Sequence, residues 1–254
     1  MTPSTTYDVC DTPPQLLNNR HYWLGYGHLY RLDDPDVTMY RSGVAHPLLN
    51  GVLRVARGGF ARARSLAASF GDLPSTWWIG EDSYPGLADD LVAAGGTQVA
   101  TMPVMAARVD AVPDQRAVPG LTIETVPAAG LREWVSTYAP SMGVAPDQQE
   151  ASLAMEAGHA ETPAHLVRFA GRVDGEVVGT SALLDRAGVG GIYLVSTTEA
   201  HRRRGIGAAL TAAAVAEAGR RNLPMVTLQA SRLGEPVYRR MGFTTVAHYR
   251  LFTL

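Results

Sequence analysis

Apolar and polar residues follow each other along the chain in two periods, one typical of strands and one typical of helices. Alternating or β-branched runs predict strands at 37–41, 51–55, 76–80, 98–109, 121–126, 165–173, 176–184, 191–197, 225–230 and 244–254. Helical periodicity or a high alanine content predicts helices near Gln15 and at 61–69, 87–94, 131–138, 148–157 and 206–221. Strands and helices therefore alternate, as in α/β and α+β proteins.

Turn-forming and helix-breaking residues mark the joints between these elements. Asp174-Gly175 lies between two alternating runs and predicts a tight hairpin. Pro103 is expected to interrupt its strand, and Pro140, Gly143 and Pro146 are expected to separate the helix at 131–138 from the next one. The segment 110–120 has two prolines, a glycine and no periodicity, which predicts a linker.

One stretch combines a predicted strand, a basic turn and a helix that opens on glycines. The strand at 191–197 is followed by Arg202, Arg203 and Arg204, and then by a helix that begins with Gly205-Ile206-Gly207-Ala208. This order leaves backbone N–H groups unpaired at the positive end of a helix dipole, where phosphate binds. Glycine lets an anion approach the backbone, and arginine adds charge-assisted contacts. A solvated helix start is the alternative interpretation of the arginines alone.

Several kinds of site and protein are excluded by the sequence. No Gly-Lys-Ser or Gly-Lys-Thr tripeptide occurs, and Leu210 stands where a dinucleotide fingerprint would need its third glycine. Cys10 is the only cysteine, so an internal disulfide and a cysteine-based zinc site are excluded, and we expect no metal site. The net charge of -2 offers no overall field for nucleic acid. No apolar run approaches the ~20 residues of a membrane helix, so we expect a cytoplasmic location.

The motif Arg202-x-x-Gly205-x-Gly207 resembles the pyrophosphate-binding signature of the GCN5-related N-acetyltransferase (GNAT) superfamily. The resemblance continues downstream, where 225–230 is similar to the next strand of the family. Ser231 begins a stretch similar to the loop and helix of the acceptor side, which ends in Tyr238-x-x-x-Gly242-Phe243. The resemblance implies that acetyl-coenzyme A is the co-substrate and covers about 121–254.

The N-terminal half repeats the same order of elements with lower specificity. Its nearest candidate for a phosphate turn, Gly58-Gly59-Phe60-Ala61-Arg62, lacks the Arg-x-x-Gly-x-Gly spacing. The resemblance therefore implies an α+β (α/β) fold with two GNAT-like domains, each a mixed, mostly antiparallel sheet flanked by helices. We place a degenerate GNAT-like domain at 1–112, a linker at 113–120 and the catalytic domain at 121–254. An unrelated α/β domain is the alternative for the first half.

The resemblance also assigns roles to residues outside the turn. If Leu194 and Val195 lie where the family strand splays, their backbone groups would pair with the pantetheine amides, and Thr197 would lie beside them. Ser231 either touches the pantetheine arm or only caps the following helix. Tyr238 is the candidate general acid for the departing sulfur; the alternative is that it only hydrogen-bonds the sulfur. The general base stays open among Glu124, His159, His165, Asp185, Glu199 and an ordered water.

Together these features predict an enzyme that transfers an acyl group, in the first place acetyl, from coenzyme A to a small-molecule amine. We expect direct attack in a ternary complex, because no cysteine or Ser/His constellation marks a covalent nucleophile. The turn recognises phosphate and not the acyl tail, so a longer acyl-CoA or an acyl carrier protein remains an alternative donor. A non-catalytic module that binds coenzyme A, and a homodimer formed through the N-terminal half, are further alternatives.

Overall fold

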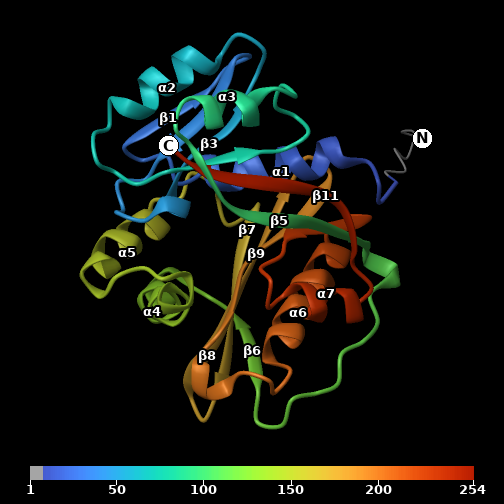
Figure 1. The fold of residues 1–254 in the computed structure, drawn as a ribbon. Helices are drawn as coiled ribbons and strands as arrows, with labels where there is room; N and C mark the ends of the chain where they lie inside the picture. Colours follow the sequence, from blue (N-terminus) through green and yellow to red (C-terminus); the bar gives the residue numbers. More distant parts are fainter. Residues whose placement is uncertain (1–7) are drawn as a thin grey trace.

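The computed structural model describes residues 8–254, which form one mixed sheet flanked by helices (Figure 1). The sheet has eleven strands in the order β1-β2-β3-β4-β11-β5-β10-β9-β8-β7-β6. The strands are β1 Tyr30–Asp33, β2 Val37–Arg41, β3 Asn50–Val55, β4 Thr76–Ile79, β5 Thr97–Arg108, β6 Thr122–Thr125, β7 Leu166–Val173, β8 Glu176–Arg186, β9 Val189–Thr197, β10 Met225–Gln229 and β11 Thr244–Thr253.

The helices match the sequence predictions closely. They are α1 Thr12–Leu24, α2 Phe60–Ala68, α3 Leu87–Ala93, α4 Leu131–Met142, α5 Gln149–Ala157, α6 Ile206–Arg220 and α7 Glu235–Arg240. The predicted break between α4 and α5 is present but begins at Gly143 rather than at Pro140, because α4 continues through Pro140 to Met142. The missing N–H lies in the last turn, and the carbonyl it would have bonded belongs to the exposed Ser136, which water can reach. No helix in this part of the chain is long and apolar enough to cross a bilayer.

The same arrangement of elements occurs twice in the sheet. In the first half, β1, β2 and β3 are antiparallel and β4 runs parallel to β3, with α2 as the crossover. In the second half, β7, β8 and β9 are antiparallel and β10 runs parallel to β9, with α6 as the crossover. Each parallel strand is followed by a short helix, α3 or α7, and then by a last strand, β5 or β11. The two sheets that the sequence predicts are thus present, joined into one.

The joint is made by the last strands of the two halves, which lie side by side in Figure 1. The C-terminal strand β11 lies between β4 and β5, both from the first half, and β5 pairs with β10 of the second half. The prediction that 244–254 closes the sheet therefore holds only in part, since β11 lies inside it. The limits 1–112 and 121–254 stay a prediction.

Pro103 does not interrupt β5 as the sequence suggested. Its carbonyl accepts a hydrogen bond from the Ala230 amide at 3.0 Å, just beyond the last residue pair of β10 and β5. In an antiparallel strand the N–H and C=O of one residue point to the same side. The missing N–H therefore faces Ala230, just past the end of β10, so the proline removes at most one bond at the end of this pairing.

Helices cover the sheet on both faces, and α1 joins the two halves. Helices α6 and α7 pack on one face of the second half, and α4 and α5 contribute to the cluster on the other face (Figure 1). Helix α1 contacts β8 and β9 as well as β2. Its Tyr22 stacks on Tyr193 of β9 with ring centroids 3.7 Å apart. The Asn18 amide donates to carbonyls of β8 and β9, at 2.9 Å to Val189. The first helix of the chain is thus built into the core of the second half.

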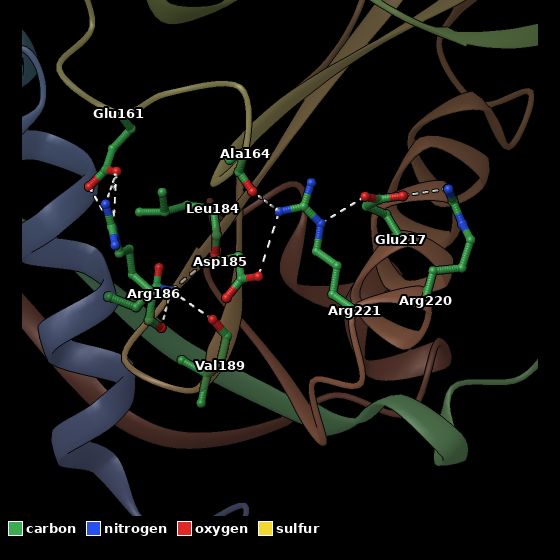
Figure 2. Close-up of polar contacts among 10 residues, drawn as sticks. Glu161, Ala164, Leu184, Asp185, Arg186, Val189, Glu217, Arg220 and Arg221 are labelled. Atoms are coloured by element: carbon green, nitrogen blue, oxygen red, sulfur yellow. Dashed lines mark hydrogen bonds and ion pairs between the residues drawn. The ribbon is translucent and has the colours of Figure 1, made fainter.

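Ion pairs hold the C-terminal end of α6 and the neighbouring loop (Figure 2). Arg221 donates to Glu217 at 2.7 Å and to the Ala164 carbonyl at 2.6 Å, and lies 3.6 Å from Asp185 of β8. Arg186 at the end of β8 pairs with Glu161 at 2.6 Å. A helix of this length spans about 22 Å. Fixing its C-terminal end to β8 therefore helps to fix its N-terminus, where the predicted phosphate-binding turn lies.

Candidate functional site

A cleft opens where β9 and β10 separate. The two parallel strands pair only at Gly190–Val226 and Gly191–Thr227, although β9 continues to Thr197. The rest of β9 therefore diverges from β10 and leaves a wedge between them. The cleft in this wedge has a volume of about 850 Å³, within the range of pockets that hold small ligands.

A bulge lies in β9 at the mouth of the wedge. The register with β8 shifts between Thr180 and Ala182, which face Ser196 and Tyr193, so Leu194 and Val195 together oppose one residue. Leu194 has φ of 48°, a left-handed conformation that costs free energy for a branched side chain and often marks a functional site. The Thr180 hydroxyl donates to the Leu194 carbonyl at 2.7 Å and holds the bulge. An extra residue leaves backbone groups out of the ladder, as the proposed contact with the pantetheine amides requires.

The N-terminus of α6 lies at the end of β9. A short 3-10 turn, Glu199–His201, follows β9, and Gly205 with φ of 87° caps α6 without a side-chain hydrogen bond. Within residues 8–254 the amides of Gly205, Ile206, Gly207 and Ala208 donate to no protein acceptor. Four N–H groups therefore point outward at the positive end of a helix of 15 residues, the arrangement that binds phosphate.

The arginines of the turn are exposed and free to bind an anion. None of Arg202, Arg203 and Arg204 forms an ion pair in the described part of the chain, and Arg202 donates only a long hydrogen bond, 3.4 Å, to the Thr197 carbonyl. Arg203 has φ of 64°. Arg202 and Arg203 line the cleft, whereas Arg204 does not. The prediction of a basic turn thus matches this geometry, with two of the three arginines directed to the cleft.

Glycine at 207 leaves space that the protein does not use. A Cβ at that position would lie 3.7 Å from the Thr197 Oγ1 and 3.9 Å from the Val195 Cγ1, which are ordinary van der Waals distances. The fold itself therefore has space for a Cβ at this position. The small residue keeps the floor of the cleft open beside the unpaired amides, so the residues present fit a pyrophosphate group.

The lining of the cleft joins segments that are distant in the sequence. It consists of Gln115, Ser141, Val195, Ser196, Thr197, His201, Arg202, Arg203, Gly205, Ile206, Gly207, Ala208, Ser231, Leu233, Gly234, Val237, Tyr238, Arg240 and Met241. Ten of the twelve predicted site residues are among them. The other two, Leu194 and Arg204, are next in sequence to lining residues. No aspartate or glutamate of the described chain lines the cleft, so its charged side chains are cationic.

Tyr238 lies on α7 with its side chain in the cleft wall. Its ring packs against Gly234, where a Cβ would come within 2.8 Å of the ring, and against Phe243, with centroids 5.9 Å apart. Burial raises the pKa of Tyr238 to about 12. Among residues 8–254 no group hydrogen-bonds its hydroxyl. The hydroxyl is therefore a protonated donor without a protein partner, directed to the cleft.

Ser231 shapes the turn that leads into α7. Its Oγ accepts a hydrogen bond from the Gly234 amide at 3.1 Å, and its carbonyl accepts one from the Glu235 amide at 2.9 Å. This bond closes the turn before α7, whose N-cap is Gly234 and has no side-chain hydrogen bond, so the predicted capping role is not the one observed. The residue also lines the cleft, so contact with a ligand stays a proposal.

Ser141 and Ser196 form a hydroxyl pair that the sequence did not indicate. Ser196 lies on β9 and Ser141 in the last turn of α4, 55 residues apart, with their Oγ atoms 2.8 Å apart. Both line the cleft. Sequence reasoning also missed Gln115, His201, Arg240 and the apolar lining residues Leu233, Val237 and Met241. The basic character around 201–204 was a signal for His201; the others had none.

None of the five side chains considered as general base lines the cleft. Glu124 pairs with Arg172 at 2.6 Å, and Asp185 lies beside Arg221. His159 is buried and contacts the Tyr22 carbonyl at 3.1 Å; burial lowers its pKa to about 4. His165 and Glu199 lie outside the lining as well. Within the described chain no group of three or more potential metal ligands occurs. An ordered water stays the remaining candidate for the base.

The equivalent place in the first half is filled by the protein itself. Strands β3 and β4 also pair at only two positions and then diverge. There the Val55 amide donates to the Ser83 Oγ at 3.3 Å, and the Val55 carbonyl accepts from the Tyr84 amide at 3.0 Å. At the start of α2, Arg62 pairs with Asp34 at 2.7 Å. The backbone groups of Val55 and the charge of Arg62 are thus already paired within the protein.

Comparisons with known proteins identify the fold. The family model of the acetyltransferase (GNAT) domain matches residues 146–252. A search of curated proteins finds no match.

Among solved structures, a GCN5-related N-acetyltransferase from Kribbella flavida is similar, with a TM-score of 0.69 and 20% identity over 94% of this chain and 93% of its own. One from Sphaerobacter thermophilus has a TM-score of 0.64 and 22% identity over 86% and 75%. A tandem GNAT protein from the clavulanic acid biosynthesis pathway has a TM-score of 0.59 and 16% identity over 86% of this chain and 78% of its own. The chain has the GNAT fold, and the predicted resemblance is confirmed.

Proposed function

We propose that this chain, which carries a GNAT acetyltransferase domain at 146–252, is an N-acyltransferase that moves an acetyl group from acetyl-coenzyme A to a small-molecule amine. The observation that carries the proposal is the cleft between β9 and β10, which has four unpaired amides and two free arginines at one end and the Tyr238 hydroxyl in its wall. When bound, acetyl-coenzyme A would supply the acyl thioester; the protein supplies binding, orientation and hydrogen bonds.

The roles of the residues follow from their places in the cleft. Gly205, Ile206, Gly207 and Ala208 would hold the pyrophosphate through their amides, with Arg202 and Arg203 adding charge. The bulge at Leu194 and Val195 would offer backbone groups to the pantetheine arm. A preorganised backbone N–H beside the thioester carbonyl lowers the barrier by a few kcal/mol. Tyr238 would donate its proton, or a hydrogen bond, to the departing sulfur.

We further propose that the first half is a degenerate GNAT-like domain and that the chain is a tandem protein with a linker at 113–120. Two features support this: the repeated strand order and the filled cleft around Val55. An acyl carrier protein or a longer acyl-CoA stays an alternative donor, because the turn recognises only phosphate.

Two measurements test the proposal. Calorimetry should show binding of coenzyme A that weakens with added salt, since exposed arginines contribute to it. Incubation with acetyl-coenzyme A and a panel of primary amines should release free thiol. Binding without turnover on any amine would favour the non-catalytic module, and absence of binding would contradict the site.

A further inference from the structure

We infer that Ser196 accepts a hydrogen bond from the incoming amine and that Ser141 positions it for this task. The inference rests on the proposed acyl transfer and assigns the acceptor side of the same cleft. Ser196 is the residue that would touch the substrate, and Ser141 acts through it.

The direction of the hydrogen bonds follows from the number of protons available. The Ser141 Oγ lies 2.8 Å from the Tyr138 carbonyl oxygen and 2.8 Å from the Ser196 Oγ. A carbonyl only accepts, so the single hydroxyl proton of Ser141 is donated to Tyr138. Ser196 must therefore donate its own proton to Ser141. The lone pairs of the Ser196 Oγ are left free, and this residue lines the cleft.

The two faces of β9 separate the proposed cofactor side from the acceptor side. Val195 and Thr197 are the side chains nearest to the open space at Gly207, so they face α6. Successive residues of a strand point to opposite faces, and Ser196 contacts Ser141 of α4 on the other side. An amine that attacks a thioester held on the α6 side would approach from the α4 side, past Ser196.

The pair orients the amine and does not remove its proton. The chain of hydrogen bonds ends at the Tyr138 carbonyl, which cannot take up a proton and pass it on. A serine hydroxyl that already donates to a neighbour offers its lone pairs to an N–H group. The site thus selects acceptors that donate a hydrogen bond from the attacking atom, and the proton leaves through water.

Two coenzyme A thioethers of equal length test this without knowledge of the natural amine. S-(2-aminoethyl)-coenzyme A places an ammonium group just beyond the sulfur, and S-propyl-coenzyme A places a methyl group there. Calorimetry at pH 7 gives the ratio of their affinities for the wild type, Ser196→Ala, Ser196→Thr and Ser141→Ala. Coenzyme A itself, measured with every variant, is the control for an intact cofactor site.

We expect the preference for the aminoethyl probe to fall by about 10-fold in Ser196→Ala, the usual size for a hydrogen bond with a charged partner. Ser196→Thr should keep it. Ser141→Ala should lower it by about 3-fold, because the freed Ser196 hydroxyl can then turn its proton to the cleft. The double alanine variant should match Ser196→Ala, because Ser141 acts only through Ser196.

An unchanged ratio in Ser196→Ala, with normal affinity for coenzyme A, would overturn this inference and leave the proposed function intact. If the wild type binds no coenzyme A, the proposed function itself fails. Should Ser196→Ala not fold, Ser141→Ala is the remaining test, because Ser141 is exposed and its replacement should not disturb the core. An unchanged ratio in Ser141→Ala would contradict the inference that Ser141 positions Ser196.

Discussion

Removal of one hydroxyl, by Tyr238→Phe, tests how the departing sulfur is stabilised. The ring packs against Gly234 and Phe243 and stays in the variant. The hydroxyl has no protein partner in the described chain, so its loss leaves no buried group unsatisfied. The fold should therefore survive, and any loss of activity reports on the hydroxyl itself.

The size of the effect follows from the pKa of the phenol. Burial raises the pKa of Tyr238 to about 12, whereas a thiol such as that of cysteine has a pKa of ~8.5. Complete proton transfer to the thiolate would thus be uphill by about 5 kcal/mol. A hydrogen bond to the developing charge stabilises it by about 1.5–3 kcal/mol. We therefore expect kcat to fall by about 10²-fold, with little change in affinity for coenzyme A.

Single-turnover measurement with acetyl-coenzyme A and a reactive amine is the assay, because it separates chemistry from product release. Tyr249→Phe is a matched control, since this buried tyrosine of β11 lies outside the cleft and its hydroxyl has no partner in the described chain. Tyr238 stays protonated below its raised pKa, so the wild-type rate should not fall between pH 7 and 10. A wild-type rate in Tyr238→Phe would refute the reasoning and leave the acid unassigned.

Three further predictions concern binding and stability. Gly207→Asp should abolish binding of coenzyme A in calorimetry while the far-UV spectrum stays unchanged, because a Cβ fits but a carboxylate repels phosphate; normal affinity would contradict the turn. The chain should bind one coenzyme A, because Ser83 and Tyr84 occupy the backbone groups of Val55; a stoichiometry of two would refute this. The folded-state pKa of His159 is lowered to about 4. The neutral, buried ring therefore contributes to the stability of the fold above the unfolded-state pKa of ~6.5, and this contribution is lost as the pH falls towards 4. Urea titrations between these pH values should show the free energy of unfolding fall by up to about 3 kcal/mol on this account. The fall should be smaller in His159→Gln.

The sequence determined the features that depend on neighbouring residues. Asp174 and Gly175 both have positive φ, as the predicted hairpin requires. Gly205 caps α6 in the left-handed conformation that glycine adopts at low cost. Strand and helix periods placed almost every element, because side-chain direction repeats every two or 3.6 residues regardless of what packs against them. The motif Arg202-x-x-Gly205-x-Gly207 is likewise local, since its spacing along the chain is enough to predict a phosphate-binding turn.

The tertiary structure decided what depends on residues remote in the sequence. The insertion of β11 between β4 and β5 joins segments about 170 residues apart, and no local pattern encodes which edge a strand will find. The bulge at Leu194 and the contact of Ser141 with Ser196 exist only because β8 and α4 pack against β9. Each such contact contributes little to the free energy of folding by itself. Its position is therefore fixed by the packing of the complete chain and not by the residues that make it.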